Sequence, residues 1–247
     1  MTTRRIFRIT GRDSRDFLQG LVTNDVGKLA QGLVYAALLT PQGKYIADFF
    51  LAPDASDGDA VLLDVTAPLA DDLLKRLRMY KLRADVDIAE CGLNLQRGTG
   101  PAPAGAWPDP RHEALGWRAY GTAPESDDGS DWDAIRVAHC IPESGIELTP
   151  DSYILEAGFD RLNGVDFRKG CYVGQEVTAR MRHKTELRKG LARVRVEGDA
   201  GPGAEITSGG KPAGTLHTRA GDTAIAYLRF DRAEGDMQAG DATLRRI

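Results

Sequence analysis

The final part of the chain limits the fold most strongly, because it consists of short apolar runs separated by glycines. Five runs have the length and alternation of β-strands, and they cover residues 192–196, 204–207, 213–217, 224–228 and 242–246. Glycines such as Gly209-Gly210 and Gly221 supply tight corners between the runs, and no helical period interrupts the pattern. Short strands with frequent corners close into small barrels. We therefore predict a small β-barrel over residues 185–247.

The first part of the chain contains the pattern of a β-hairpin. Two apolar runs, 34–40 and 45–51, flank Pro41-Gln42-Gly43-Lys44, whose proline and glycine can reverse the chain. Asp48 is the one acid inside the second run. Its carboxylate lies either on an exposed face of the hairpin or in a functional position.

Helical and strand patterns follow one another around this hairpin. A helix opened by Thr66 and Pro68 carries a leucine stripe on one face, which consists of Leu69, Leu73, Leu74 and Leu77. Strand patterns occur at residues 6–9, 61–65 and 84–89. This order favours an α+β fold in which an antiparallel sheet has helices on one side.

Changes in composition suggest the domain organisation. The glycine- and proline-rich stretch 98–110 and the acidic stretch 125–130 are typical of loops, and a strand at 117–120 lies between them. We predict an α+β region over residues 1–184, which could itself consist of two subdomains with a break near 91–110. The barrel of residues 185–247 follows it.

The bulk composition excludes several classes of protein. The chain has 247 residues, 42% of them hydrophobic, and a net charge of −4, which is typical of a globular protein and not of a general nucleic-acid binder. No long apolar run indicates a signal peptide or a membrane span, so we expect a cytoplasmic protein. The three cysteines and four histidines lack the spacing of a self-contained metal site.

The stretch Lys169-Gly170-Cys171-Tyr172-Val173-Gly174-Gln175-Glu176 is the most specific motif of the chain. Residues 175–181 can form a short helix, so Cys171 would lie where a loop enters it. A helix N-terminus favours the thiolate, and Lys169 would add to this effect if its cation lay on the same side. The alternative is a small buried thiol between two turn glycines.

Positive charge is concentrated in this part of the chain. Between residues 168 and 195, nine Lys or Arg stand against Glu176 and Glu186, giving +7, so the remainder carries −11. Clustered cations favour an anionic small ligand, a phosphate or an acidic partner nearby. The alternative is a solvated basic face.

The motif resembles the signature of the YgfZ family, bacterial relatives of a mitochondrial iron-sulfur assembly factor that are related to the glycine-cleavage T-protein. Further stretches agree with that family in order and position, namely 9–13, 17–20, 23–26, 39–44, 155–158 and 206–210. The resemblance implies a T-protein-like folate-binding α+β region followed by a small barrel. It also implies tetrahydrofolate as the ligand.

Site residues follow from the resemblance. The carboxylate of Glu156 would accept two hydrogen bonds from the pterin edge, and Arg180 or a neighbouring arginine would meet the glutamate tail of the folate. Lys169 and Tyr172 would contribute to cofactor binding. Cys171 would act as a redox-active thiol or as a transient ligand of an iron-sulfur cluster, with the other ligands supplied by a second chain, glutathione or a partner.

The sequence departs from the T-protein pattern in the hairpin. T-protein has paired aspartates there, whereas this chain has Ala47-Asp48 with one acid. We therefore expect an accessory protein that serves iron-sulfur client or assembly proteins more than an enzyme. The alternatives are a folate-dependent one-carbon (aminomethyl) transferase that uses Asp48 as a base, and a protein related to tRNA modification that contacts RNA phosphates.

Overall fold

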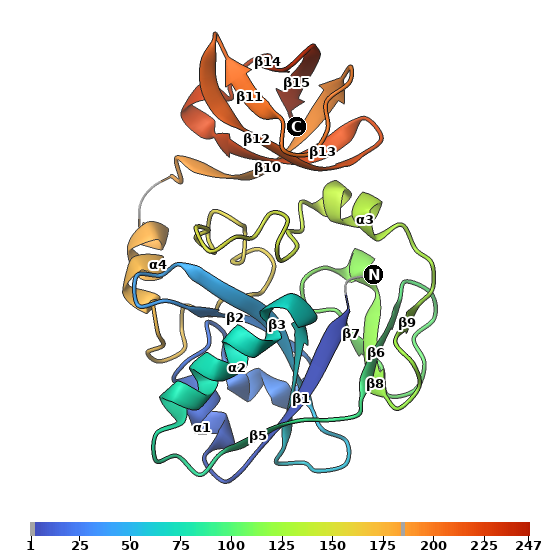
Figure 1. Cartoon of the computed structure of the whole chain (residues 1–247), viewed down its shortest axis with the longest axis vertical. Helices are drawn as coiled ribbons and strands as arrows, with labels where there is room; N and C mark the ends of the chain where they lie inside the picture. The colour runs from blue at the N-terminus through green and yellow to red at the C-terminus, as the bar shows by residue number, and fades with distance from the viewer. Residues whose placement is uncertain (1–2, 184–185) are drawn as a thin grey trace. The chain divides into compact units, whose positions relative to one another are not determined.

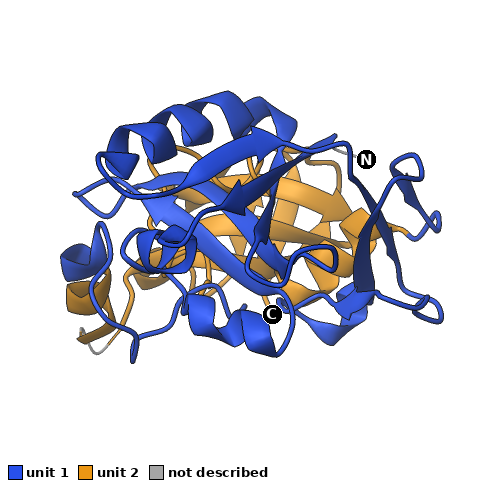
Figure 2. Cartoon of the chain, turned by 90° about the horizontal axis from the view of Figure 1, so that it is seen from below, with its two compact units in different colours: residues 1–130, 160–177 blue, residues 131–159, 178–247 orange. Residues whose placement is uncertain are grey.

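The protein is described by a computed structural model that covers residues 3–183 and 186–247. The order of its helices and strands can be followed in Figure 1. The chain divides into two compact units, which Figure 2 shows in different colours: residues 1–130 with 160–177, and residues 131–159 with 178–247. Each unit combines segments that are distant in the sequence. None of the helices in the described part of the chain is long and apolar enough to cross a bilayer.

The first unit is built on an antiparallel sheet with the strand order β2-β3-β4-β1-β5. Its strands are β1 (Arg4–Thr10), β2 (Val34–Leu39), β3 (Tyr45–Pro53), β4 (Val61–Thr66) and β5 (Asp87–Glu90). The predicted hairpin is confirmed, because β2 pairs with β3 and Ala37 lies opposite Asp48. The predicted strand at 84–89 begins later than expected, at Asp87.

One face of this sheet packs against the helices and forms the main core. The helices are α1 (Ser14–Gln19), the 3-10 helix η1 (Val26–Ala30) and α2 (Ala67–Lys81). Strand alternation directs Phe7, Phe49 and Leu63 to this face, where they meet the buried Leu73 and Leu77 of α2. The predicted leucine stripe of α2 is therefore core, with Leu69 only partly buried.

A smaller sheet with the order β7-β8-β6-β9 completes the first unit. Its elements are β6 (Asn94–Gly98), β7 (Trp107–Pro108), the 3-10 helix η2 (Glu113–Leu115), β8 (Trp117–Gly121) and β9 (Ser126–Asp127). Arg118 of β8 lies 2.6 Å from the fully buried Asp64, and Arg4 contacts the same carboxylate at 2.6 Å. Burial alone would raise the pKa of Asp64, but the two guanidinium charges hold it below its ordinary value.

The second unit contains a closed barrel with the strand order β10-β13-β12-β11-β14-β15. The strands are β10 (Lys189–Glu197), β11 (Glu205–Ser208), β12 (Lys211–Ala220), β13 (Thr223–Arg229), β14 (Met237–Ala239) and β15 (Ala242–Arg246), and the 3-10 helix η3 (Phe230–Arg232) follows β13. All five predicted strands are confirmed. The sequence pattern missed β14, which has only three residues and therefore too little alternation to detect.

Residues 131–159 belong to the same unit as the barrel. Helix α3 (Trp132–His139) packs on β12 and β13, and the buried Arg136 lies 2.9 Å from Glu147 and donates to Thr218 at 2.9 Å. The domain boundary predicted near residue 185 falls on residues 184–185, which lie outside the described residues. The division of the chain after residue 184 stays a prediction.

Candidate functional site

The cysteine motif forms a loop that leads into helix α4 (Gln175–His183), as the sequence predicts. Cys171 is exposed on this loop. All three cysteines of the chain lie among the described residues; Cys91 is half-buried and Cys140 is buried. Within residues 3–183 and 186–247, no group of three His, Cys, Asp or Glu side chains could hold a metal ion. Cys171 is therefore the most exposed of the three cysteines.

Two glycines bring the cysteine motif into contact with the hairpin turn. Gly174 and Gly43 have φ angles of 83° and 74°, in the left-handed region that favours glycine. A methyl group on Gly174 would lie 2.6 Å from the carbonyl oxygen of Thr40 and 3.1 Å from the Cα of Gly43. A methyl group on Gly43 would lie 2.8 Å from the Cβ of Val177. Two motifs far apart in the sequence thus meet through their backbones.

Lys169 fixes the other end of the motif loop. Its side chain is buried, and Nζ donates to the carbonyl oxygens of Gln19 at 2.8 Å and Val22 at 2.5 Å. Burial lowers the pKa of Lys169 to about 8, while the negative charges of Asp25 and Asp166 oppose this shift. The ammonium group therefore joins the loop to the last residue of α1 and to the segment that follows this helix.

Tyr172 lies next to this anchor. Its side chain is buried, and the Nζ atom of Lys169 lies 5.2 Å from the centre of its ring. The sequence suggested that Lys169 could stabilise the thiolate of Cys171, but its ammonium group donates to backbone carbonyls. Lys169 and Tyr172 hold the loop from inside the first unit, and their contact with a folate stays a prediction.

The polar segment 23–25 binds the chain just before the motif. Thr23 Oγ1 donates to the carbonyl oxygen of Gly164 at 2.7 Å, and Asn24 Nδ2 donates to that of Asn163 at 2.6 Å. The backbone N–H of Asp166 donates to the carbonyl oxygen of Thr23 at 3.0 Å. Three stretches that carry the family resemblance, 23–26, 39–44 and 169–176, are therefore connected within one unit.

Asp48 is buried on β3, which excludes the exposed alternative. Its Oδ1 accepts a hydrogen bond from Tyr45 Oη at 2.6 Å, and its Oδ2 accepts one from Tyr35 Oη at 2.9 Å. Burial and then the charge of Asp48 raise the pKa of Tyr35 well above its ordinary value. Both carboxylate oxygens are thus engaged by phenol groups, which the sequence pattern did not indicate.

Glu156 is held by the barrel in the second unit. Its Oε2 accepts a hydrogen bond from Tyr227 Oη at 2.7 Å, and its backbone carbonyl accepts one from the N–H of Leu191 at 2.7 Å. A methyl group on Gly190 would lie 2.8 Å from the same carbonyl oxygen. Burial, followed by the bond to Glu156, raises the pKa of Tyr227. Within the described residues, Oε1 of the half-buried Glu156 accepts no hydrogen bond.

Arg180 lies on α4 and its side chain is exposed. This side chain forms no hydrogen bond or ion pair with any residue that the structure describes. Its guanidinium group is therefore available to an anionic ligand. Arg180 and Glu156 belong to the second unit, whereas Asp48 and the residues 169–172 belong to the first.

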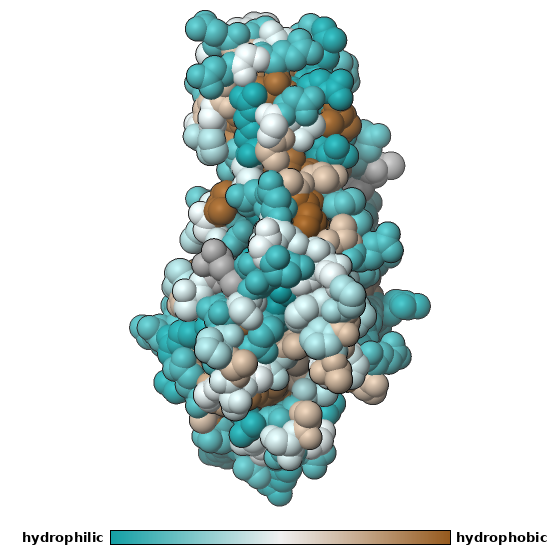
Figure 3. All heavy atoms as spheres, turned by 90° about the vertical axis from the view of Figure 1, so that its right-hand side faces the viewer, coloured by the Kyte–Doolittle hydropathy of each residue, from teal (hydrophilic) through white to brown (hydrophobic). Residues whose placement is uncertain are grey.

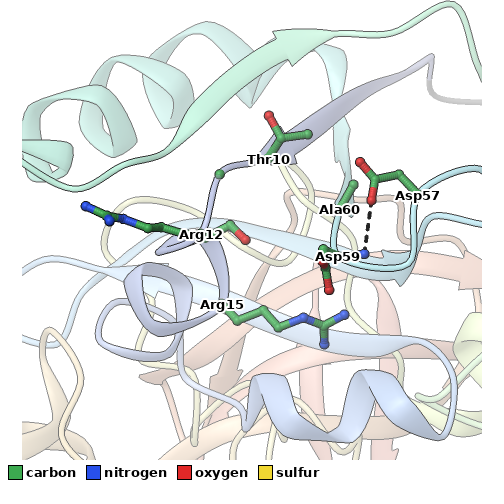
Figure 4. Close-up of a pocket in the computed structure, with 8 residues that line it drawn as sticks. Thr10, Arg12, Arg15, Asp57, Asp59 and Ala60 are labelled. Carbon is green, nitrogen blue, oxygen red and sulfur yellow. Dashed lines mark hydrogen bonds between the residues drawn. The ribbon is translucent and has the colours of Figure 1, made fainter.

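A cavity of about 490 Å³ lies in a different part of the first unit, as Figure 4 shows. Its lining includes Arg12, Arg15, Asp57 and Asp59. The guanidinium group of Arg12 points away from the two acids, and Asp57 accepts a hydrogen bond from the N–H of Asp59 at 3.1 Å. The candidate site residues do not line this cavity, so it carries no part of the predicted chemistry.

The architecture matches a known class of proteins. The solved structure of glycine cleavage system aminomethyltransferase T from Bartonella henselae aligns with a TM-score of 0.77 over 100% of this chain and 83% of that chain. At 13% sequence identity, this likeness shows the fold alone. The family model described as CAF17, C-terminal beta-barrel domain, matches residues 188–247. The protein therefore has the aminomethyltransferase-like α+β fold with a C-terminal β-barrel.

Named relatives define the family within this class. The chain is 30% identical to the mitochondrial iron-sulfur cluster assembly factor IBA57 of Mus musculus, over 95% of this chain and 78% of the relative. The Homo sapiens protein matches at 30% identity with the same coverage. The chain belongs to the IBA57 family of iron-sulfur cluster assembly factors. It spans about half the length of the fungal homologue from Mycosarcoma maydis, with 32% identity over 54% of that protein.

The expectation of a cytoplasmic location is wrong. The relatives from Mus musculus, Homo sapiens and Mycosarcoma maydis are all named as mitochondrial proteins. The expectation rested on the lack of a long apolar run. A mitochondrial targeting segment is amphipathic and rich in arginine, so apolar length is the wrong criterion for it.

Proposed function

We propose that the protein binds tetrahydrofolate and supports the assembly or repair of iron-sulfur clusters in other proteins. The observation that carries this proposal is the exposed thiol of Cys171 on a loop fixed at both ends, by Lys169 and by Gly174. Named relatives that are iron-sulfur cluster assembly factors support it. The resemblance of the motif to the bacterial YgfZ signature is consistent with the same role.

The chemistry of Glu156 and Arg180 fits a folate. The Glu156 carboxylate is oriented by Tyr227 and keeps acceptor capacity on Oε1, as a donor edge with an amino group and a ring N–H requires. Each charge-assisted hydrogen bond of this kind contributes about 1.5 to 3 kcal/mol. Arg180 offers a cation for the carboxylates of the folate tail. Bound tetrahydrofolate would carry one-carbon chemistry.

In this role, Cys171 supplies one thiolate ligand to an iron-sulfur cluster that is passed on to a client protein. One thiolate cannot enclose an iron-sulfur cluster, which is generally held by four protein ligands. The remaining ligands would come from a second chain, from glutathione or from a client or assembly protein. The protein would therefore hold a cluster only while such a partner is bound.

The hydrogen bonds of the Asp48 carboxylate favour the accessory role over one-carbon transfer. A general base must lie within hydrogen-bond reach of the proton that it accepts, and the Asp48 side chain is buried. Both oxygens of Asp48 accept hydrogen bonds from tyrosines, and the neighbouring position is Ala47 instead of a second acid. We expect no aminomethyl transfer; folate-dependent release of ammonia from an aminomethylated lipoyl carrier would contradict this expectation.

Titration with tetrahydrofolate tests the ligand assignment. We expect saturable binding to the wild-type protein and at least about tenfold weaker binding to Glu156→Gln, because the amide lacks the charge and one acceptor. Glu186→Gln removes an exposed carboxylate and serves as the matched control with unchanged affinity. Cys171→Ala should also bind normally. Equal affinities of the wild type and Glu156→Gln would contradict the role of Glu156.

A further inference from the structure

The C-terminal end of α2 presents a strained, exposed leucine among unpaired cations. The exposed side chains at this end and just after it, together with the half-buried Lys81, are called the α2-end surface: Lys75, Arg78, Met79, Lys81, Leu82 and Arg83. We propose that the α2-end surface docks a partner protein whose contact patch combines apolar side chains with Asp or Glu. This proposal is independent of the folate and thiol chemistry described above.

Leu82 occupies a backbone position that is normally reserved for glycine. Its φ and ψ angles are 46° and −105°, and the N–H of Ala84 donates to the carbonyl oxygen of Lys81 at 2.8 Å. These features define a type II′ turn with Leu82 at its first central position, where glycine avoids a steric clash. The Leu82 side chain is 87% exposed, so its burial does not offset the strain. Strain that folding does not explain is typical of functional positions.

Met79 provides a second apolar side chain beside Leu82. It is 62% exposed and three residues earlier in the chain. Helical spacing puts Lys75, Arg78 and Met79 on one side of α2, away from the leucines that face the core. In Figure 3 the visible face of the molecule is mostly hydrophilic, with hydrophobic residues in small separate areas. Met79 and Leu82 are two of four large hydrophobic side chains that are exposed in the described part of the chain.

The cations of the α2-end surface have no acidic partners. With the described residues, the side chains of all four cations form no hydrogen bond or ion pair: Lys75, Arg78, Lys81 and Arg83. Three acids of the same stretch of chain are engaged by other arginines, in the pairs Asp71 with Arg5, Asp72 with Arg76, and Asp85 with Arg12. Unpaired cations around an apolar pair are complementary to an acidic patch with apolar side chains at its centre.

A protein fits this surface better than a nucleic acid or a membrane. Single-stranded nucleic acid is recognised by exposed aromatic rings between cations, but Tyr80 is half-buried and packs against the core. A membrane-binding helix needs a broad apolar face toward the lipid, whereas the leucines of α2 face the interior of the unit. The exposed apolar pair at the centre of the cations favours an acidic protein surface with apolar side chains.

Photo-crosslinking in cells tests the proposal with the full chain. A photoreactive amino acid is placed at Leu82, and Ile146, which is 43% exposed in the second unit, is the matched control position. We expect a protein adduct at position 82 and not at 146, with an acidic segment at the crosslinked site. Arg78→Glu with Arg83→Glu should reduce the adduct at least about tenfold, and a Glu→Lys change in that partner segment should restore it.

Three results would overturn the proposal. The first is the absence of an adduct that is specific to position 82. The second is an adduct with RNA or lipid in place of protein. The third is an adduct whose yield is unchanged by charge reversal while thermal unfolding confirms that the double variant is folded.

Discussion

Gly174 packs against Gly43 without room for a side chain on either residue. Because both residues also have positive φ angles, Gly174→Ala should be doubly unfavourable. We expect it to lower the free energy of unfolding by at least about 2 kcal/mol, measured by urea denaturation. A methyl group on Gly170 would meet no atom within 4 Å beyond its chain neighbours, so Gly170→Ala is the matched control and should change stability by less than about 0.5 kcal/mol. Similar losses in both variants would contradict the close approach.

Lys169 gives the stability of the first unit a pH dependence with a defined sign. Its pKa is lowered from 10.5 in the unfolded chain to about 8 in the folded state, so the unfolded chain binds more protons between these values. Stability should therefore rise as the pH increases from about 8 to 10.5. The facing charges are Asp25, Asp166 and Lys28, and the two acids oppose the effect.

A comparison of wild type with Lys169→Met isolates this contribution. Between about pH 8 and 10.5, the free energy of unfolding of the wild type should rise relative to that of Lys169→Met, by no more than about 3 kcal/mol. Urea denaturation at several pH values measures it. Parallel pH curves for the two proteins would show that the pKa of Lys169 is not lowered in the folded state.

Arg136 and Glu147 connect the segment 131–159 to the barrel. Their side chains are almost fully buried, and Glu147 also accepts a hydrogen bond from Thr218 Oγ1 at 2.5 Å. Arg136→Met should cost about 3 to 5 kcal/mol, because Glu147 is left as a buried unpaired charge. Thermal unfolding measures the loss, with Arg229→Met in an exposed pair as the control that leaves the midpoint unchanged. A small effect of Arg136→Met would mean that the segment is not a stable part of this unit.

Leu82→Gly separates strain from function at the α2-end surface. Glycine adopts the φ angle of 46° without a clash, so the variant should be more stable by about 0.4 to 1 kcal/mol in urea denaturation. Leu82→Ala keeps the strain and removes most of the side chain, so it should have wild-type stability. If Leu82→Gly were less stable than the wild type, Leu82 would contribute to folding, and the argument from strain would fail.

The sequence predicted the elements whose side chains follow a regular period. The hairpin, the leucine stripe of α2 and five barrel strands all follow from local alternation or helical spacing. It missed β14, which is too short for a period, and the pair of Asp64 with Arg118, whose members are far apart in the sequence. Local patterns do not encode such long-range pairs.

The sequence predicted the motifs of the candidate site, but not which of their residues contact one another. The motif around Cys171 and the turn at Gly43 are visible in the sequence, and only the fold shows that their glycines meet. The Lys169 ammonium group donates to the carbonyl groups of Gln19 and Val22, which lie about 150 residues earlier in the chain, so its orientation could not be predicted from the motif. The phenol groups on Asp48 follow from strand pairing, which directs Tyr35 and Asp48 to the same face.

The central claim is that iron-sulfur cluster assembly requires the thiol of Cys171. The most direct test measures the activity of an iron-sulfur enzyme in cells that depend on this protein. Cells whose only copy of this protein is the Cys171→Ala variant should lose most of this activity. We expect this variant to accumulate, fold and bind tetrahydrofolate as the wild-type protein does. Cys91→Ala is the matched control, because it removes a half-buried thiol and should retain the activity. Full enzyme activity with Cys171→Ala would contradict the account.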